Sequence, residues 1–120
     1  MIKILLADDN PIVLSSLRLM LETRLDVEII REARDMAHVI AQVEDSHPDC
    51  VILDWNLPGR PMRGRIPVLK ALGENIHIIV VNTRPELEKE ILAEGADEFV
   101  CRTDPPEKLL DAIHRISTKN

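Results

Sequence analysis

Short apolar runs alternate with longer amphipathic segments along the chain. Five of the runs are rich in Val, Ile or Leu, and most lack the polar alternation of a strand with one wet face. They span Ile2–Ala7, Val27–Ile30, Cys50–Leu53, Ile76–Val81 and Glu98–Cys101. Such runs are typical of strands in a parallel sheet that is covered on both faces.

The segments between the runs have the spacing of amphipathic helices. Asn10 and Asp35 are suitable N-caps for the first two helices. Thr83–Glu86 has the form of a capping box, and Gly95 is placed to end the helix that follows it. The last helix is expected to open at Asp104–Glu107.

The third connection is the least regular. Pro58–Pro67 contains three prolines and two glycines in ten residues, so we predict no regular helix there. Only about Val68–Leu72 remains for a short helix. Five β–α units joined in this way predict an α/β fold, with a five-stranded parallel sheet and helices on both faces.

Length and composition narrow the class of protein. The 120 residues fit one domain, residues 1–120, and 45% hydrophobic content fits a globular one. A net charge of −6 disfavours direct nucleic-acid binding by this domain. No segment approaches the roughly 18 apolar residues of a membrane span, and the start lacks a signal-peptide cleavage site. With Cys50 and Cys101 expected as buried thiols, we predict a cytoplasmic protein without a membrane partner.

Charged side chains follow three of the apolar runs. Asp8 and Asp9 follow the first, Asp54 the third and Arg102 the fifth. Sites in parallel sheets lie beyond the carboxyl ends of the strands, and clustered carboxylates need a cation such as Mg²⁺. Each residue alone is explained as well by a solvated helix entry or a surface charge. Together they indicate a phosphoryl-transfer site with a metal, an acceptor carboxylate and a positive clamp.

Three segments carry a resemblance to a known family. They are Ile4–Pro11, Pro48–Gly59 and Gly95–Val100. With them the chain resembles the receiver domain of bacterial two-component response regulators, which has a flavodoxin-like (βα)5 fold. The Asp-Asp-Asn-Pro opening is most similar to receivers of the NarL/LuxR type, which usually carry a helix-turn-helix output domain. Any such DNA-binding module would lie outside these 120 residues.

The resemblance implies a role for each matching residue. Asp54 matches the aspartate that a histidine kinase phosphorylates. Asp9 matches the direct metal ligand, and Asp8 the carboxylate that holds the metal through water. Asn56 matches the position whose backbone carbonyl completes the magnesium site. Phe99 matches an aromatic switch position, although a ring that simply fills the core explains it equally well.

The resemblance also implies an output surface, and two further functions compete with it. Residues 85–115 would form the face that changes partner or forms a homodimer. A pseudo-receiver, a docking or dimerisation module without phosphorylation, is the main alternative. A small phosphatase of similar fold fits poorly, because Asn56 stands where such enzymes present a second aspartate.

Two positions depart from the family pattern. The fourth strand should end in Ser or Thr followed by a small residue, and here Asn82 and Thr83 stand there. A register shifted by one residue places Thr83 at the hydroxyl position instead. The fifth strand should end in Lys, and here Arg102 stands there; it would clamp a phosphoryl group or pair with Asp54 or Asp9 in the resting state.

The irregular third connection is also basic. Arg60, Arg63 and Arg65 occur within six residues. A solvated basic loop explains them, and so does a docking patch for an acidic partner surface beside Asp54.

Overall fold

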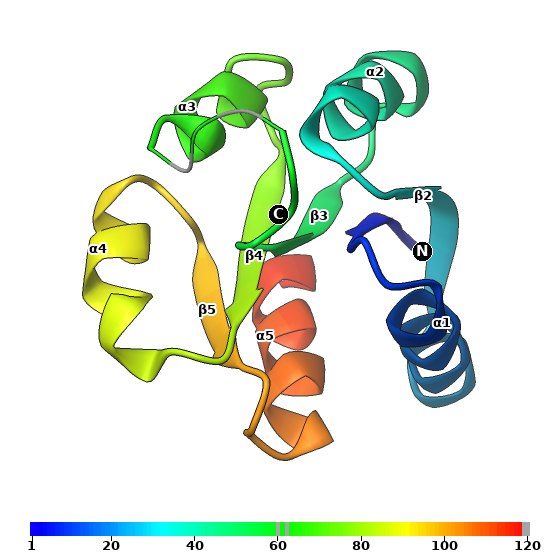
Figure 1. Cartoon of the computed structure of the whole chain (residues 1–120). Coiled ribbons are helices and arrows are strands. Elements are labelled where there is room, and N and C mark those ends of the chain that lie inside the picture. The colour runs from blue at the N-terminus through cyan, green and yellow to red at the C-terminus, as the bar shows by residue number, and fades with distance from the viewer. Residues whose placement is uncertain (60, 62, 119–120) are drawn as a thin grey trace.

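Strands and helices alternate along the chain (Figure 1). The structure is a computed structural model, and it describes residues 1–59, 61 and 63–118. The strands are β1 (Ile2–Ala7), β2 (Val27–Ala33), β3 (Cys50–Asp54), β4 (His77–Asn82) and β5 (Glu98–Cys101). The helices are α1 (Pro11–Arg24), α2 (Met36–Ser46), α3 (Arg65–Lys70), α4 (Glu88–Ala93) and α5 (Pro106–Ser117), with a 3₁₀ turn η1 (Pro85–Leu87) before α4.

The five strands form one parallel sheet in the order β2-β1-β3-β4-β5. This confirms the predicted α/β architecture. Nearly every residue of the three central strands is buried, whereas the edge strands β2 and β5 are partly exposed. The apolar runs without alternation therefore reflect strands covered on both faces.

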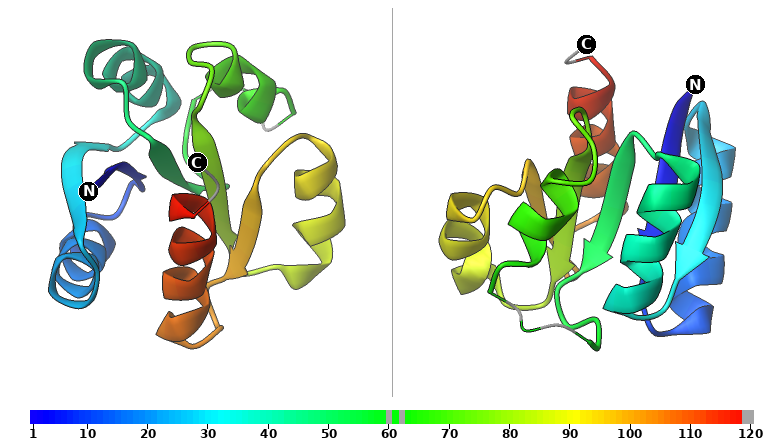
Figure 2. Two further views of the ribbon diagram at one scale, coloured as in Figure 1. Left: turned by 180° about the vertical axis from the view of Figure 1, so that it is seen from behind. Right: turned by 90° about the horizontal axis from the view of Figure 1, so that it is seen from above.

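Helices cover both faces of the sheet (Figures 1 and 2). One core cluster joins α2, α3 and α4 to one face, and the second joins α1 and α5 to the other. The single tryptophan, Trp55, lies in the first cluster and is buried. Cys50 and Cys101 are buried free thiols, as expected.

The predicted caps of the first two helices are confirmed. The side chain of Asn10 accepts hydrogen bonds from the backbone N–H groups of Ile12 and Val13. The side chain of Asp35 accepts from the N–H of His38. Each cap satisfies donors that have no partner within the helix.

The expected capping box before the fourth helix is wrong. Pro85–Leu87 forms a 3₁₀ turn, α4 begins only at Glu88, and Arg84 at the N-cap position of η1 makes no side-chain cap bond. The N–H of Arg84 donates instead to Oδ1 of Asn82 (2.9 Å). The side chain of Asn82 therefore accepts the hydrogen bond made at the start of this segment. Gly95, with φ of +114°, lies just beyond the end of α4.

The third helix begins earlier than predicted. It spans Arg65–Lys70, so the segment up to Pro67 is not irregular throughout. Pro67 fits because it lies in the first turn, where a backbone N–H has no partner within the helix. Among the described residues, no helix is long and apolar enough to cross a membrane.

The strand order places a crevice between β1 and β3. The chain runs from β1 outward to β2 and then returns to β3 on the other side of β1. The carboxyl ends of β1 and β3 are therefore neighbours at the point where the strand order reverses, which is where such sheets bind ligands.

Candidate functional site

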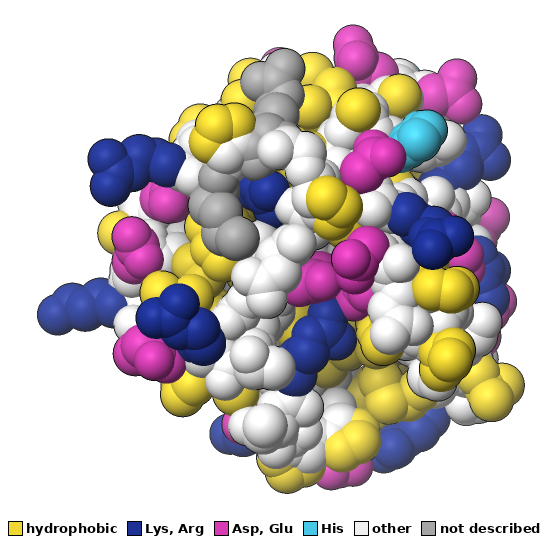
Figure 3. All heavy atoms as spheres, in the orientation of Figure 1, with side chains coloured by type: hydrophobic (Ala, Val, Ile, Leu, Met, Phe, Trp, Pro, Cys, Tyr) yellow, Lys and Arg dark blue, Asp and Glu magenta, His cyan; other side chains and the backbone are white. Residues whose placement is uncertain are grey.

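Three carboxylates meet at this crevice. Asp8 and Asp9 follow β1, and Asp54 ends β3. One carboxylate oxygen from each lies within 4.8 Å of the others. Asp8 and Asp54 are buried, while Asp9 is exposed. The space-filling view shows acidic side chains gathered beside a Lys or Arg side chain near the middle of one face (Figure 3).

The carboxylate of Asp54 is held in place by backbone groups next to it. Its Oδ1 accepts a hydrogen bond from the N–H of Asn56 (3.1 Å). The backbone carbonyl of Asp54 accepts a hydrogen bond from the N–H of Leu57 (3.1 Å). Burial raises the pKa of Asp54 above the ordinary value of 3.8, and the field of Asp8 adds to this; the Asn56 N–H and Arg102 oppose it. A backbone N–H therefore orients one oxygen of this carboxylate.

Arg102 connects two of the acids. Its Nη2 lies 2.5 Å from Oδ2 of Asp8 and 3.6 Å from Oδ1 of Asp54. The other oxygen of Asp8 accepts from the N–H of Asn10 (2.9 Å). The contact with Asp54 was among the two expected for Arg102, but the shorter contact with Asp8 was not.

The end of β4 resolves the register of Asn82 and Thr83. Val81 is the residue paired with Asp54 in the sheet, and Asn82 follows it as the last residue of the strand. Asn82 is 1% exposed, whereas Thr83 is exposed outside the strand. Asn82 is thus the buried last residue of the strand next to β3, and Thr83 lies outside that strand.

Asn82 also carries an unused hydrogen-bond donor. Its Oδ1 accepts from the N–H of Arg84, but its Nδ2 is buried and has no hydrogen-bond partner among the described residues. A buried amide donor without a partner is costly, so such a group points to a ligand or water that completes it.

The acid cluster suits a small divalent cation. Its ligand atoms are carboxylate oxygens, which are the hard ligands that Mg²⁺ prefers, and one member is open to solvent. Asp8, Asp9 and Asp54 therefore fit a magnesium ion. Asn56 is exposed directly after this cluster, where its backbone carbonyl is the expected fourth ligand.

Phe99 lies on β5, apart from the acids. It is partly buried and packs against the same core cluster as Leu87. This position suits both interpretations of the residue, a core ring and a ring free enough to change orientation.

The arginines of the third connection differ in burial. Arg65 is only 3% exposed, so both a solvated loop and a surface docking patch are wrong for this residue. Its Nη1 donates to the carbonyl of Trp55 (2.9 Å) and its Nε to that of Pro61 (3.3 Å). Arg63 is exposed, and Arg60 lies outside the described residues. Sequence reasoning missed the buried arginine because a charged residue in a Pro- and Gly-rich segment has no periodic signal.

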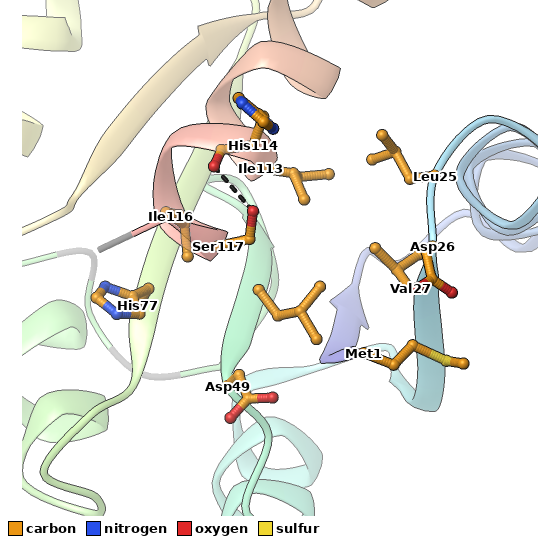
Figure 4. A pocket seen from close by; sticks show the side chains of 11 residues that line it. Met1, Leu25, Asp26, Val27, Asp49, His77, Ile113, His114, Ile116 and Ser117 are labelled. Atoms are coloured by element: carbon orange, nitrogen blue, oxygen red, sulfur yellow. Dashed lines mark hydrogen bonds between the residues drawn. The ribbon is translucent and has the colours of Figure 1, made fainter. Parts of the chain in front are cut away.

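Two hollows lie at opposite ends of the strands, one at their carboxyl ends and one at their amino ends. One, of about 290 Å³, is bounded by Asp8, Asp54 and Arg102 and by apolar residues of α1 and α5. The other, of about 460 Å³, is lined by the starts of β1, β2 and β4 and the end of α5 (Figure 4). His77 and His114 both line the second hollow, which lies away from the acids.

Comparison with known proteins identifies related chains. The family profile described as "Response regulator receiver domain" matches residues 4–114. The nitrate/nitrite response regulator protein NarL of Escherichia coli K12 is 30% identical over 114 residues, which is 93% of this chain and 53% of NarL. The transcriptional activator protein ExaE of Pseudomonas putida is 32% identical over 120 residues, which is 94% of this chain and 54% of ExaE. The chain thus spans about half the length of these curated relatives.

Solved structures share the fold. RcsB of Salmonella enterica serovar Typhimurium, bound to promoter rprA in the presence of the phosphomimetic BeF3⁻, is 25% identical with a TM-score of 0.86. The match covers 98% of this chain and 100% of that one. The sheet whose strand ends hold Asp8 and Asp54 therefore belongs to an architecture found in known regulators.

Proposed function

Because the chain belongs to the response regulator receiver domain family, we propose that it is a phosphoacceptor switch in which Asp54 receives a phosphoryl group from a histidine kinase. The observation that carries this proposal is the cluster at the strand ends. Asp54 is buried, oriented by a backbone N–H, and placed with Asp8 and Asp9 so that their oxygens lie within 4.8 Å.

The proposed transfer uses Asp54 as the nucleophile. One of its carboxylate oxygens attacks phosphorus, the bond from phosphorus to the kinase imidazole nitrogen breaks, and that nitrogen keeps the electron pair. The N–H of Asn56 holds the carboxylate during the attack. Mg²⁺ bound by Asp8, Asp9 and Asp54 would supply positive charge for the phosphoryl oxygens. The resulting acyl phosphate is labile, so hydrolysis resets the switch.

Two side chains complete the proposed site. Arg102 lies 3.6 Å from Asp54 and supplies a fixed positive charge where the negative phosphoryl group would arrive. Asn82 supplies the buried Nδ2 donor that has no partner among the described residues. Thr83 follows it outside the strand, and we propose no contact between Thr83 and the phosphoryl group.

The proposed output is a change in the surface formed by residues 85–115. This segment includes η1, α4 and β5 and most of α5, and Phe99 lies within it. We propose that phosphorylation alters this surface, through which two copies of the chain or another partner associate. The RcsB structure includes promoter DNA. We propose that this domain, which spans half of its curated relatives, itself makes no DNA contact.

The intact acid cluster supports the switch over a pseudo-receiver. A module that docks without phosphorylation has no need for three carboxylates brought together at a crevice, because their mutual repulsion costs free energy. The substitutions at Asn82 and Arg102 retain a donor and a cation at their positions.

Incubation with acetyl phosphate and Mg²⁺, followed by intact-mass measurement, tests the proposal. We expect a gain of one phosphoryl group that depends on Mg²⁺ and is lost in Asp54→Asn. A wild-type protein that gains no phosphoryl group and binds no Mg²⁺ would contradict the switch. An adduct that persists in Asp54→Asn would move the acceptor to another residue.

A further inference from the structure

A buried arginine lies behind the phosphoacceptor strand. Arg65, the first residue of α3, is 3% exposed, although arginine is seldom fully buried unless its charge and donors are satisfied. The proposed site already has Arg102 as its cation, so Arg65 needs a separate explanation.

The contacts of Arg65 lead to Asp54 through a single peptide unit. Nη1 of Arg65 donates to the carbonyl of Trp55 (2.9 Å). The N–H of the same Trp55–Asn56 peptide donates to Oδ1 of Asp54 (3.1 Å). A positive charge at the carbonyl end of a peptide polarises it and makes its N–H a stronger donor. One peptide unit therefore connects Arg65 to Asp54.

Arg65 and the residue before it both make further hydrogen bonds. Nε of Arg65 donates to the carbonyl of Pro61 (3.3 Å), which ties α3 to the connection before it. The N–H of the preceding Gly64 donates to Oε1 of Glu94 at the end of α4 (3.0 Å). Burial lowers the pKa of Arg65 and the field of Asp54 raises it, in agreement with a direct electrostatic link between them.

We propose that Arg65 is a positioning residue for phosphoryl transfer, which fixes and polarises the Trp55–Asn56 peptide and thereby orients the Asp54 carboxylate for attack. This inference rests on the proposed function of Asp54. It assigns the buried part of the basic connection to the reaction rather than to partner docking.

Three variants of the full chain separate this role from simple packing. Arg65→Met keeps much of the side-chain length but removes the charge and the donors. Arg65→Lys keeps the charge and one donor group. Arg63→Met makes the same change of charge at the exposed neighbour and serves as the matched control.

The first measurement is the rate of phosphorylation by acetyl phosphate at saturating donor and Mg²⁺. We expect Arg65→Met to lower this rate by about tenfold or more, because a hydrogen bond involving a charged group is lost, while the donor concentration at half-maximal rate stays unchanged. Arg65→Lys should recover much of the rate, and Arg63→Met should match the wild type. A wild-type rate in Arg65→Met would overturn the proposal, as would equal losses in the Met and Lys variants.

The second measurement does not depend on phosphorylation. The Asn56 amide proton should move upfield in the NMR spectrum of Arg65→Met as its bond to Asp54 weakens, and return toward the wild-type position in Arg65→Lys. An unchanged Asn56 resonance would overturn the proposal even if Asp54 is phosphorylated. If the wild type is never phosphorylated, the proposed function fails while this resonance still reports the peptide link. Should Arg65→Met not fold, Arg65→Gln takes its place, because it also removes the charge while keeping a polar side chain. Wild-type values for both the rate and the Asn56 resonance of Arg65→Gln would overturn the proposal.

Discussion

Nη2 of Arg102 lies 2.5 Å from Oδ2 of Asp8, which joins the carboxyl end of β5 to that of β1 across the sheet. The same nitrogen is 3.6 Å from Asp54. One guanidinium thus offsets the repulsion between two buried carboxylates. A metal ion at the acid cluster would meet a carboxylate that already has a cationic partner.

Removal of this guanidinium should strengthen magnesium binding while weakening phosphoryl transfer. Because a partly exposed ion pair is worth about 1 kcal/mol, we expect Arg102→Gln to bind Mg²⁺ roughly fivefold more tightly. The rate of phosphorylation by acetyl phosphate should fall, since the fixed charge opposite Asp54 is lost. Titration of Trp55 fluorescence with Mg²⁺ measures the affinity. Arg115→Gln, which breaks the remote ion pair with Glu98, should leave the affinity and the rate unchanged. Weaker Mg²⁺ binding in Arg102→Gln would contradict the idea that Arg102 and Mg²⁺ compete for the Asp8 carboxylate.

The buried amide donor of Asn82, which has no partner within the described part of the chain, predicts a contrast between two substitutions. Asn82→Asp keeps the oxygen that accepts from Arg84 but replaces the donor with a negative charge at the end of the strand that pairs with the strand of Asp54. We expect at least about a tenfold lower phosphorylation rate from the added repulsion and the lost donor. Asn82→Thr restores a short hydroxyl donor and should retain most of the rate. Stopped-flow measurement of Trp55 fluorescence with acetyl phosphate compares them, and an Asn82→Asp protein as fast as the wild type would exclude a role for Nδ2.

The strand ends were predictable from sequence, but the contacts made there were not. Buried parallel strands are continuous apolar runs, so the point where Asp8 and Asp54 end them is visible in the sequence. The partner of Arg102 depends on how side chains point across neighbouring strands, which periodicity does not encode. The burial of Arg65 depends on a carbonyl ten residues earlier in the chain. Similarly, α4 begins at Glu88 only after a 3₁₀ turn, which the capping-box pattern of Thr83–Glu86 did not predict.

A carboxylate at the amino end of β5, that of Asp97, should control the acid stability of the fold. Oδ2 of Asp97 accepts from Nζ of Lys70 (2.6 Å) and from the N–H of Ile78 (2.7 Å). Burial raises the pKa of Asp97, but these hydrogen bonds and the lysine charge outweigh it, so the pKa lies below the ordinary 3.8. A lowered pKa in the folded state adds stability above the unfolded value, and this stability is lost as the pH falls through the folded value.

Asp97→Asn should therefore lower the free energy of unfolding by about 1–3 kcal/mol at about pH 6. The difference in unfolding free energy between wild type and variant should shrink below about pH 4, where the unfolded wild-type carboxyl takes up a proton. Urea unfolding at several pH values measures this gap. Glu107→Gln, at an exposed pair with Arg24, should change stability by less than about 0.5 kcal/mol. A gap that stays constant down to about pH 3 would show that the charge of Asp97 contributes nothing.

Two glycines that flank the basic connection predict unequal costs for the same substitution. Gly59 and Gly64 have φ of +124° and +91°, so an alanine is strained at either position. A Cβ at Gly59 would lie 2.9 Å from Cβ of Met36, whose N–H is bound to the carbonyl of Pro58, whereas a Cβ at Gly64 meets no atom within 4 Å. We expect Gly64→Ala to cost about 1 kcal/mol from strain alone and Gly59→Ala about 2–4 kcal/mol, because its clash adds to the strain.

Unfolding in guanidinium chloride measures this difference. Equal losses of unfolding free energy in the two variants would show that Met36 moves aside without a loss of stability. Gly59 ends the short segment that begins at Asp54. If the clash displaces that segment, Gly59→Ala should also shift the Asn56 amide resonance, while Gly64→Ala should leave it in place. The comparison therefore tests whether the close approach of Gly59 to Met36 of α2 also fixes the Trp55–Asn56 peptide to which Arg65 donates.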